Sequence, residues 1–167
     1  RMTLKKTCWY TCIHPCRIGA LIGTRGEIDL ERFNRFGFYM GAAFQIQDDI
    51  LNLVGDREKY GKEIGGDIWE GKRTMILIHV INNCTEDEKE RMRLFLSTPR
   101  KQRLHKDVSW VYELISRYDS IEFSRKVARQ LAAGALREFP VAYSGLPRSH
   151  DKLFIKNIVL YMIEREL

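Results

Sequence analysis

The stretch Phe38-Tyr39-Met40-Gly41-Ala42-Ala43-Phe44-Gln45-Ile46-Gln47-Asp48-Asp49-Ile50-Leu51-Asn52 joins an apolar run to a pair of adjacent carboxylates. It lies within residues 30–53, where apolar side chains recur at helical spacing after a potential cap at Asp29. Gly37 and Gly41 lie one turn apart and lower the helix propensity, so we expect them to allow close approach of a neighbouring helix. The stretch therefore predicts a long, largely buried helix that ends at a polar site.

The flanking segments also follow a helical pattern, without a convincing series of strands or an internal repeat. Residues 4–22 read as a helix that His14-Pro15 should kink or break. Residues 55–71 contain five glycines and have no steady period, which is typical of a functional or a disordered loop. Further helices are expected at residues 74–82, 85–96, 108–118, 120–139 and 153–165, with a capping signature over residues 85–88 and a connection over residues 140–151. The predicted fold class is all-α.

Composition is that of a soluble globular protein. The 167 residues suffice for one compact domain, and 44% apolar with 30% charged residues argues against disorder. No apolar run approaches the roughly 20 residues that span a bilayer, and no secretory signal is visible. The four cysteines fit reduced thiols better than a disulfide framework, so we expect a cytoplasmic protein. The net charge of +6 favours anionic partners.

The carboxylate pair suits a magnesium ion. On a helix, Asp48 and Asn52 are about 40° apart around the axis, and Asp49 lies at the edge of the same face. Oxygen-bearing side chains so placed suit Mg²⁺, which bridges carboxylates to substrate phosphates. Gln45 adds an amide one turn earlier. The alternative is an exposed helix face, but adjacent carboxylates after a buried run are costly unless they bind something positive.

Cationic residues accompany this site. Lys62 and Lys72 each follow a glycine in the Gly-rich stretch, and Lys6-Thr7 lies at the start of the first helix. Lysine provides a compact charge for phosphate oxygens, and a threonine hydroxyl can donate to them. Each lysine alone could equally be a surface residue, and it is their occurrence together with the carboxylates that indicates a diphosphate site.

Together these motifs closely resemble the trans-isoprenyl diphosphate synthases of the polyprenyl synthetase family, which include the farnesyl and geranylgeranyl diphosphate synthases. The resemblance extends to the end of the chain, with residues 146–149 and a closing helix. The matching motifs are Lys6-Thr7, residues 44–52, Gly55-Asp56, Gly61-Lys62, Gly65-Gly66-Asp67 and Gly71-Lys72-Arg73-Thr74.

That resemblance implies an all-α bundle around a deep cavity, with two aspartate-rich motifs facing each other across three Mg²⁺ ions. It implies a prenyltransferase that ionises an allylic diphosphate and adds the cation to isopentenyl diphosphate, a dimer, and no nucleic acid partner. By similarity, the metal ligands are Asp48, Asp49 and Asn52. The residues that bind the allylic diphosphate are Lys6, Thr7, Gln45, Lys62 and Lys72, of which Lys6, Thr7, Gln45 and Lys62 are also assigned catalytic roles.

Two departures from the family pattern matter. Asn52 stands where the family commonly has Asp, and the first aspartate-rich motif is missing from residues 1–167. We therefore expect this chain to be the C-terminal part of a single synthase domain that is inactive alone. It would be a fragment, one piece of a nicked protein, or a subunit completed by another chain. The alternatives are a terpene synthase on the same scaffold and a non-catalytic partner subunit of a prenyl synthase.

Two other features have simpler explanations, and a third has two. Cys8, Cys12 and Cys16 recur every four residues near His14, but structural zinc sites use tighter pairs, so we expect buried thiols on one helix face. The basic run at residues 100–106 is expected to be a solvated loop. Aromatic residues could line a prenyl pocket or belong to the core, and both interpretations remain open for Trp9, Tyr10, Phe36, Tyr39 and Phe44.

Overall fold

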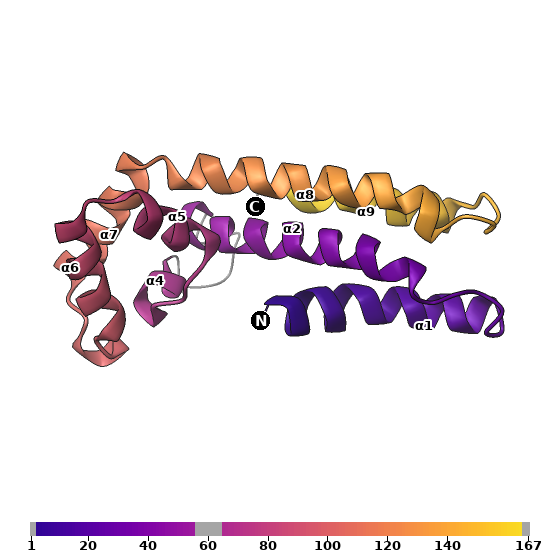
Figure 1. Cartoon of the computed structure of the whole chain (residues 1–167), viewed down its shortest axis with the longest axis horizontal. Helices are drawn as coiled ribbons and strands as arrows, with labels where there is room; N and C mark the ends of the chain where they lie inside the picture. Colours follow the sequence, from indigo (N-terminus) through magenta and orange to yellow (C-terminus); the bar gives the residue numbers. More distant parts are fainter. Residues whose placement is uncertain (1–2, 56–64, 165–167) are drawn as a thin grey trace. The chain divides into compact units, whose positions relative to one another are not determined.

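The computed structural model describes residues 3–55 and 65–164, and within these ranges the regular structure is entirely helical (Figure 1). The prediction of an all-α protein is confirmed. The chain divides into two compact units. The first comprises Arg1–Gln47 and Val127–Arg165, and the second contains Asp48–Lys126.

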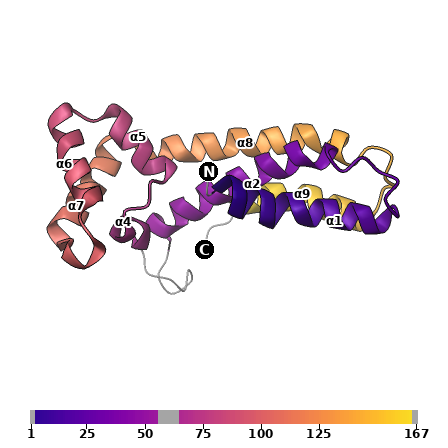
Figure 2. The same cartoon turned by 60° about the horizontal axis from the view of Figure 1, so that its bottom comes forward.

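The first unit is built from a π-helix and four α-helices, two of which continue into the second unit. Figures 1 and 2 show the α-helices of this unit running alongside one another. The elements are η1 (Leu4–Ile13), α1 (His14–Gly23), α2 (Arg32–Val54), α8 (Ser120–Ala142) and α9 (His150–Glu164).

The predicted interruption at His14-Pro15 is a change of helix type. The π-helix η1 ends at Ile13, and α1 begins with Pro15 in its first turn, where the missing N–H of proline is tolerated. The backbone of Ile13 and His14 stays in the right-handed helical region. The chain therefore continues as a helix through this point and exchanges one hydrogen-bond register for another.

Gly37 and Gly41 let η1 approach α2 closely, as predicted. A Cβ atom at Gly41 would lie 2.6 Å from Cys8 Cα, and one at Gly37 would lie 2.9 Å from Ile13 Cα. Both neighbours are backbone atoms, which cannot move aside as a flexible side chain can. Any larger residue at these positions would force the two helices apart.

The core of the first unit forms around aromatic side chains of α2 and of the end of α8, including Tyr143 directly after it. Phe33 and Phe36 of α2 are fully buried and pack edge-on against Tyr143.

The predicted end of the helix before Pro140 is wrong, because α8 runs to Ala142. Proline removes a single backbone donor there, the amide of Tyr143 still donates to the Phe139 carbonyl at 3.0 Å, and burial of the last turn compensates.

The thiols on η1 and at the start of α1 are buried or half-buried, close to expectation. Cys8 and Cys12 are almost fully covered and Cys16 is half-buried, and all of them are free. Burial raises the pKa of the Cys12 thiol to about 12, with smaller contributions from Cys16 and Cys8. Over the part of the chain that the structure describes, no three His, Cys, Asp or Glu side chains gather to hold a metal.

The second unit consists of shorter helices after the end of α2. Thr74 caps α5, and Thr85 with Glu88 forms the predicted capping box of α6. α7 begins three residues earlier than the sequence predicts, at His105. The elements are α4 (Gly66–Glu70), α5 (Met75–Asn83), α6 (Glu86–Ser97), η2 (Arg100–Gln102), α7 (His105–Arg117) and the beginning of α8.

No helix in residues 3–55 or 65–164 is both long enough and apolar enough to cross a bilayer.

Candidate functional site

In the first unit, the structure joins two predicted site residues that are far apart in sequence. Thr7 Oγ1 donates a hydrogen bond of 2.6 Å to Gln45 Oε1. Thr7 is 5% exposed and Gln45 is half-buried, so this bond is partly shielded from water, whereas the neighbouring Lys6 is exposed. The carbonyl of Lys6 accepts a hydrogen bond from Thr11 Oγ1 at 3.1 Å. The η1 backbone thus presents Lys6 outward and directs Thr7 toward α2.

In the second unit, Asp48 and Asp49 occupy the last two turns of α2 and are half-buried. Asp49 lines a small hollow together with Asp67 and Lys72, and the apolar part of its wall comes from Leu53, Ile68 and Leu77. One predicted metal ligand and one predicted diphosphate-binding lysine therefore line the same hollow.

Asn52 holds the start of α4. Its side chain is nearly buried, at 7% exposure, and Asn52 Oδ1 accepts a hydrogen bond of 3.0 Å from the backbone amide of Asp67. Its backbone carbonyl accepts a second bond, of 2.6 Å, from the amide of Gly65. Asn52 thus has a structural function that its place in the aspartate-rich motif did not reveal.

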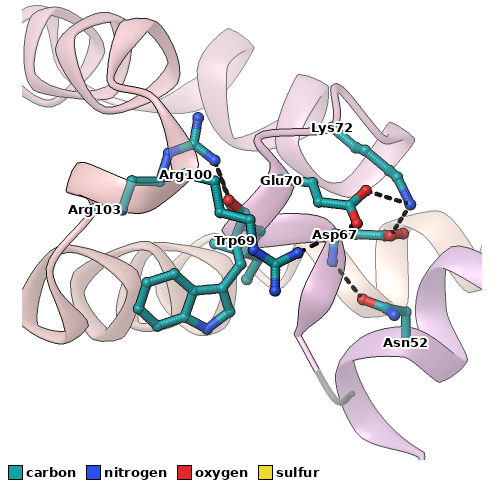
Figure 3. A network of polar contacts seen from close by, with 8 residues as sticks. Asn52, Asp67, Trp69, Glu70, Lys72, Arg100 and Arg103 are labelled. Carbon is teal, nitrogen blue, oxygen red and sulfur yellow. Dashed lines mark hydrogen bonds and ion pairs between the residues drawn. The ribbon is translucent and has the colours of Figure 1, made fainter. Parts of the chain in front are cut away.

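Lys72 is exposed and lies between two carboxylates (Figure 3). Its Nζ is 2.5 Å from Asp67 Oδ1 and 3.0 Å from Glu70 Oε2, and Glu70 also pairs with Arg100 at 3.3 Å. The hydrogen bond with Asp67 is the largest of the effects that raise the pKa of Lys72. Hydrogen bonding to Lys72 in turn lowers the pKa of Glu70. Lys72 is therefore charged throughout the physiological range.

Arg103 is a residue whose function sequence reasoning missed. It lies in the basic run that was expected to be a solvated loop, yet it is only 9% exposed, so that expectation is wrong for Arg103. Its guanidinium donates to backbone carbonyls of α4 and α6, which compensates for the loss of hydration. A charged run gives no signal of which member is buried. Asp67 was also not predicted as a site residue, but a signal for it was present, because it belongs to the matching motif Gly65-Gly66-Asp67.

The predicted residue Lys62 lies outside the described residues, as does Gly61 before it. The site is therefore built here from the two separate groups above, Thr7 with Gln45 and the hollow at the end of α2.

The residues present fit a magnesium ion. Mg²⁺ is typically held by one or two carboxylates, with waters and substrate phosphates completing its coordination. Asp48 and Asp49 provide two adjacent, half-buried carboxylates of the appropriate kind. Asn52 could add an amide oxygen, although that oxygen already accepts the Asp67 amide proton.

Comparison with known proteins identifies relatives of this chain. A sequence model of the polyprenyl synthetase family matches residues 1–115. The geranylgeranyl diphosphate synthase of Saccharolobus solfataricus is 33% identical over 129 residues, covering 75% of this chain and 38% of that protein. A short chain isoprenyl diphosphate synthase of Methanothermobacter thermautotrophicus is 29% identical over 150 residues, covering 90% of this chain and 44% of the relative.

Solved structures agree in fold. The geranylgeranyl pyrophosphate synthetase of Pyrococcus horikoshii superposes with a TM-score of 0.69 at 33% identity, covering 90% of this chain and 43% of that one. The geranylgeranyl pyrophosphate synthase of Corynebacterium glutamicum, determined with isoprenyl diphosphate and magnesium, gives a TM-score of 0.78 at 25% identity, covering 96% and 44%. This chain spans less than half the length of each of these relatives. On the strength of the family match over residues 1–115, the chain belongs to the polyprenyl synthetase family.

Proposed function

We propose that this chain provides the diphosphate-binding wall of a trans-prenyltransferase, which joins isopentenyl diphosphate to an allylic prenyl diphosphate. The observation that carries the proposal is the hollow at the end of α2, where Asp49 and Asp67 lie beside Lys72. The carboxylates can bind a diphosphate through a bridging metal ion, and the ammonium group can bind it directly. Membership of the family supports the same assignment.

In this proposal Lys72 contacts phosphate oxygens directly, assisted by Lys6 and Lys62. Asp48 and Asp49, with Asn52, would hold Mg²⁺. When bound, that ion supplies positive charge that stabilises the departing diphosphate. The allylic C–O bond breaks with its electron pair on the diphosphate, a C–C bond forms to isopentenyl diphosphate, and a proton is lost.

Thr7 and Gln45 are proposed to stabilise the cation that forms. A carbonyl oxygen carries partial negative charge, and a preoriented oxygen stabilises developing positive charge without having to reorganise. The bond from Thr7 Oγ1 to Gln45 Oε1 at 2.6 Å sets the orientation of the Gln45 amide. Thr7 therefore acts through Gln45 in this scheme.

The proposed partners are the two diphosphate substrates and either a second copy or a complementing chain. Two relatives that each match 90% of this chain are named heptaprenyl diphosphate synthase component 2, from Geobacillus stearothermophilus and Bacillus subtilis. Those names support assembly with another chain. They are also compatible with the alternative of a non-catalytic partner subunit. A cytoplasmic location remains part of the proposal.

A chimera tests the function. In the Saccharolobus solfataricus relative, the segment that matches this chain is replaced by the chain itself, and product is assayed with an allylic diphosphate, isopentenyl diphosphate and Mg²⁺. We expect a longer prenyl diphosphate from the chimera and none from the 167-residue chain alone. A folded chimera without product, beside an active parent enzyme, would contradict the proposal. Cyclised or hydrolysed product would instead indicate the terpene synthase alternative.

A further inference from the structure

The helix α4, which precedes Lys72, is too short to be stable by itself. It contains five residues, Gly66–Glu70, and an isolated helix needs about 12 or more even with a favourable sequence. Its position therefore depends on contacts with the rest of the second unit. Ile68 is fully buried, and the two ends of α4 are held by Asn52 and Arg103 (Figure 3).

Arg103 holds the C-terminal end through several bonds. Its Nη1 donates to the carbonyls of Ile68 and Trp69, at 3.2 and 2.5 Å. The same guanidinium reaches the end of α6, where its Nε donates to the Phe95 carbonyl at 3.3 Å. The last carbonyls of a helix carry partial negative charge and favour a cation. Arg103 thus joins the C-terminal ends of α4 and α6 with one planar group.

Gly71 links the position of the Arg103 guanidinium to that of Lys72. Gly71 has a φ of +66°, and a Cβ atom there would lie 2.4 Å from Arg103 Nη2. The next amide, that of Lys72, donates to the Asp67 carbonyl at 2.9 Å. The chain therefore turns tightly over the guanidinium and brings the Lys72 side chain back to Asp67. Loss of the guanidinium would free this turn as well as the end of α4.

We propose that Arg103 is the positioning residue of Lys72, setting the turn that directs its ammonium group into the hollow beside Asp67. The proposal rests on the proposed function, since Lys72 is taken there to bind diphosphate. Arg103 itself would not contact the substrate, because its donors are directed to backbone carbonyls. The planar guanidinium of arginine can donate several hydrogen bonds in one plane, and the ammonium group of lysine cannot reproduce this arrangement.

The experiment uses the full chain and two readouts. The first is the side-chain ¹⁵N resonance of the Lys72 ammonium group, assigned by its absence in K72R. We expect the ion pair with Asp67 to slow the proton exchange of this group. The second is the affinity for magnesium diphosphate. The variants are R103M and R103K, with K101M as the control from the same basic run and V80A as a control for lost stability. Circular dichroism reports helical content.

We expect R103K and R103M to lose the slowed Lys72 resonance and to bind magnesium diphosphate about tenfold more weakly, as substitution of supporting residues around ligand-binding groups commonly does. K101M, whose side chain is exposed, should match wild type in both readouts, and V80A should keep both despite a lower melting temperature.

Retention of the resonance and affinity in folded Arg103 variants would overturn the positioning role. Equal losses in V80A would also overturn it, since general instability would then explain the effect. Failure of both Arg103 variants to fold would overturn it as well, by making Arg103 a residue of the whole unit. No binding by wild type would overturn the diphosphate site itself, and the Lys72 resonance would still decide whether Arg103 positions that side chain.

Discussion

Thr7 and Gln45 lie 38 positions apart, yet the hydroxyl of one donates to the amide oxygen of the other at 2.6 Å. Thr7 lies on the π-helix η1 and Gln45 on α2. The two helices pack closely because Gly37 and Gly41 have no side chain at the contact. A polar pair proposed to act in catalysis thus depends on close helix packing one to two turns away. Substitutions at Thr7 and at Gly41 separate the contribution of the pair from that of the packing.

Replacing Thr7 by valine preserves the side-chain shape and removes the hydroxyl. We expect T7V to lower the free energy of unfolding by about 1 kcal/mol, because a half-buried acceptor loses its donor. T7S keeps the donor and should remain within about 1 kcal/mol of wild type. Urea unfolding followed by circular dichroism measures both. Equal stabilities of T7V and wild type would show that the bond contributes nothing to folding.

Glycine at position 41 is required by the backbone of η1. A methyl group at this position would meet Cys8 Cα at 2.6 Å, so G41A should destabilise the first unit by about 1–3 kcal/mol despite the better helix propensity of alanine.

The matched control is Gly19 in α1, where an added Cβ meets nothing within 4 Å. G19A should stabilise the chain by about 0.5–1 kcal/mol, because alanine restricts the unfolded chain and favours the helix. Thermal unfolding of the two variants should therefore shift in opposite directions. A shift in the same direction would refute the assigned packing.

The carboxylates Asp48 and Asp49 are expected to control dependence on magnesium. In the active chimera, the double substitution D48N/D49N should lower kcat on the order of 100-fold or more, because both anionic donors are removed while the side-chain size is kept. A magnesium titration of the rate measures the effect. The exposed Asp151 on α9 offers a control, since D151N should leave the titration unchanged. Unaltered kinetics in D48N/D49N would remove the metal assignment.

The buried thiol of Cys12 predicts a loss of stability in alkaline solution. Burial raises its pKa to about 12, so the folded state keeps this proton at pH values where the unfolded chain has released it. The stabilisation is complete below the pKa of the unfolded thiol, near 8.5, and declines as the pH rises toward 12. Unfolding free energies measured from pH 8 to 11 should fall with a shallower slope in C12A than in wild type. Identical slopes would show that Cys12 does not titrate as described.

Local features of this protein were predictable from the sequence because their partners lie within a few residues. Thr85 and Glu88 form the capping box that their spacing indicates, and Thr74 caps α5 as a threonine before an apolar run should. The close approach at Gly37 and Gly41 could also be predicted, since two glycines on one face of a buried helix leave space that only a neighbouring backbone fills. The end of α8 could not, because burial of Ala142 and Tyr143 outweighs the local effect of Pro140.

By itself, the sequence determined the all-α class, most helix boundaries and the family to which the chain belongs, since these depend on periodicity and on motif spacing along the chain. Only the tertiary structure decided that Asn52 holds α4 and that Arg103 is buried. Their partners lie far along the chain: Asn52 meets Asp67 15 residues away, and Arg103 meets Ile68 35 residues away. The physical reason is that burial and hydrogen bonding of a polar side chain are set by the segments that fold around it. The local sequence around an arginine in a basic run is the same whether its side chain is exposed to water or buried against the ends of two helices.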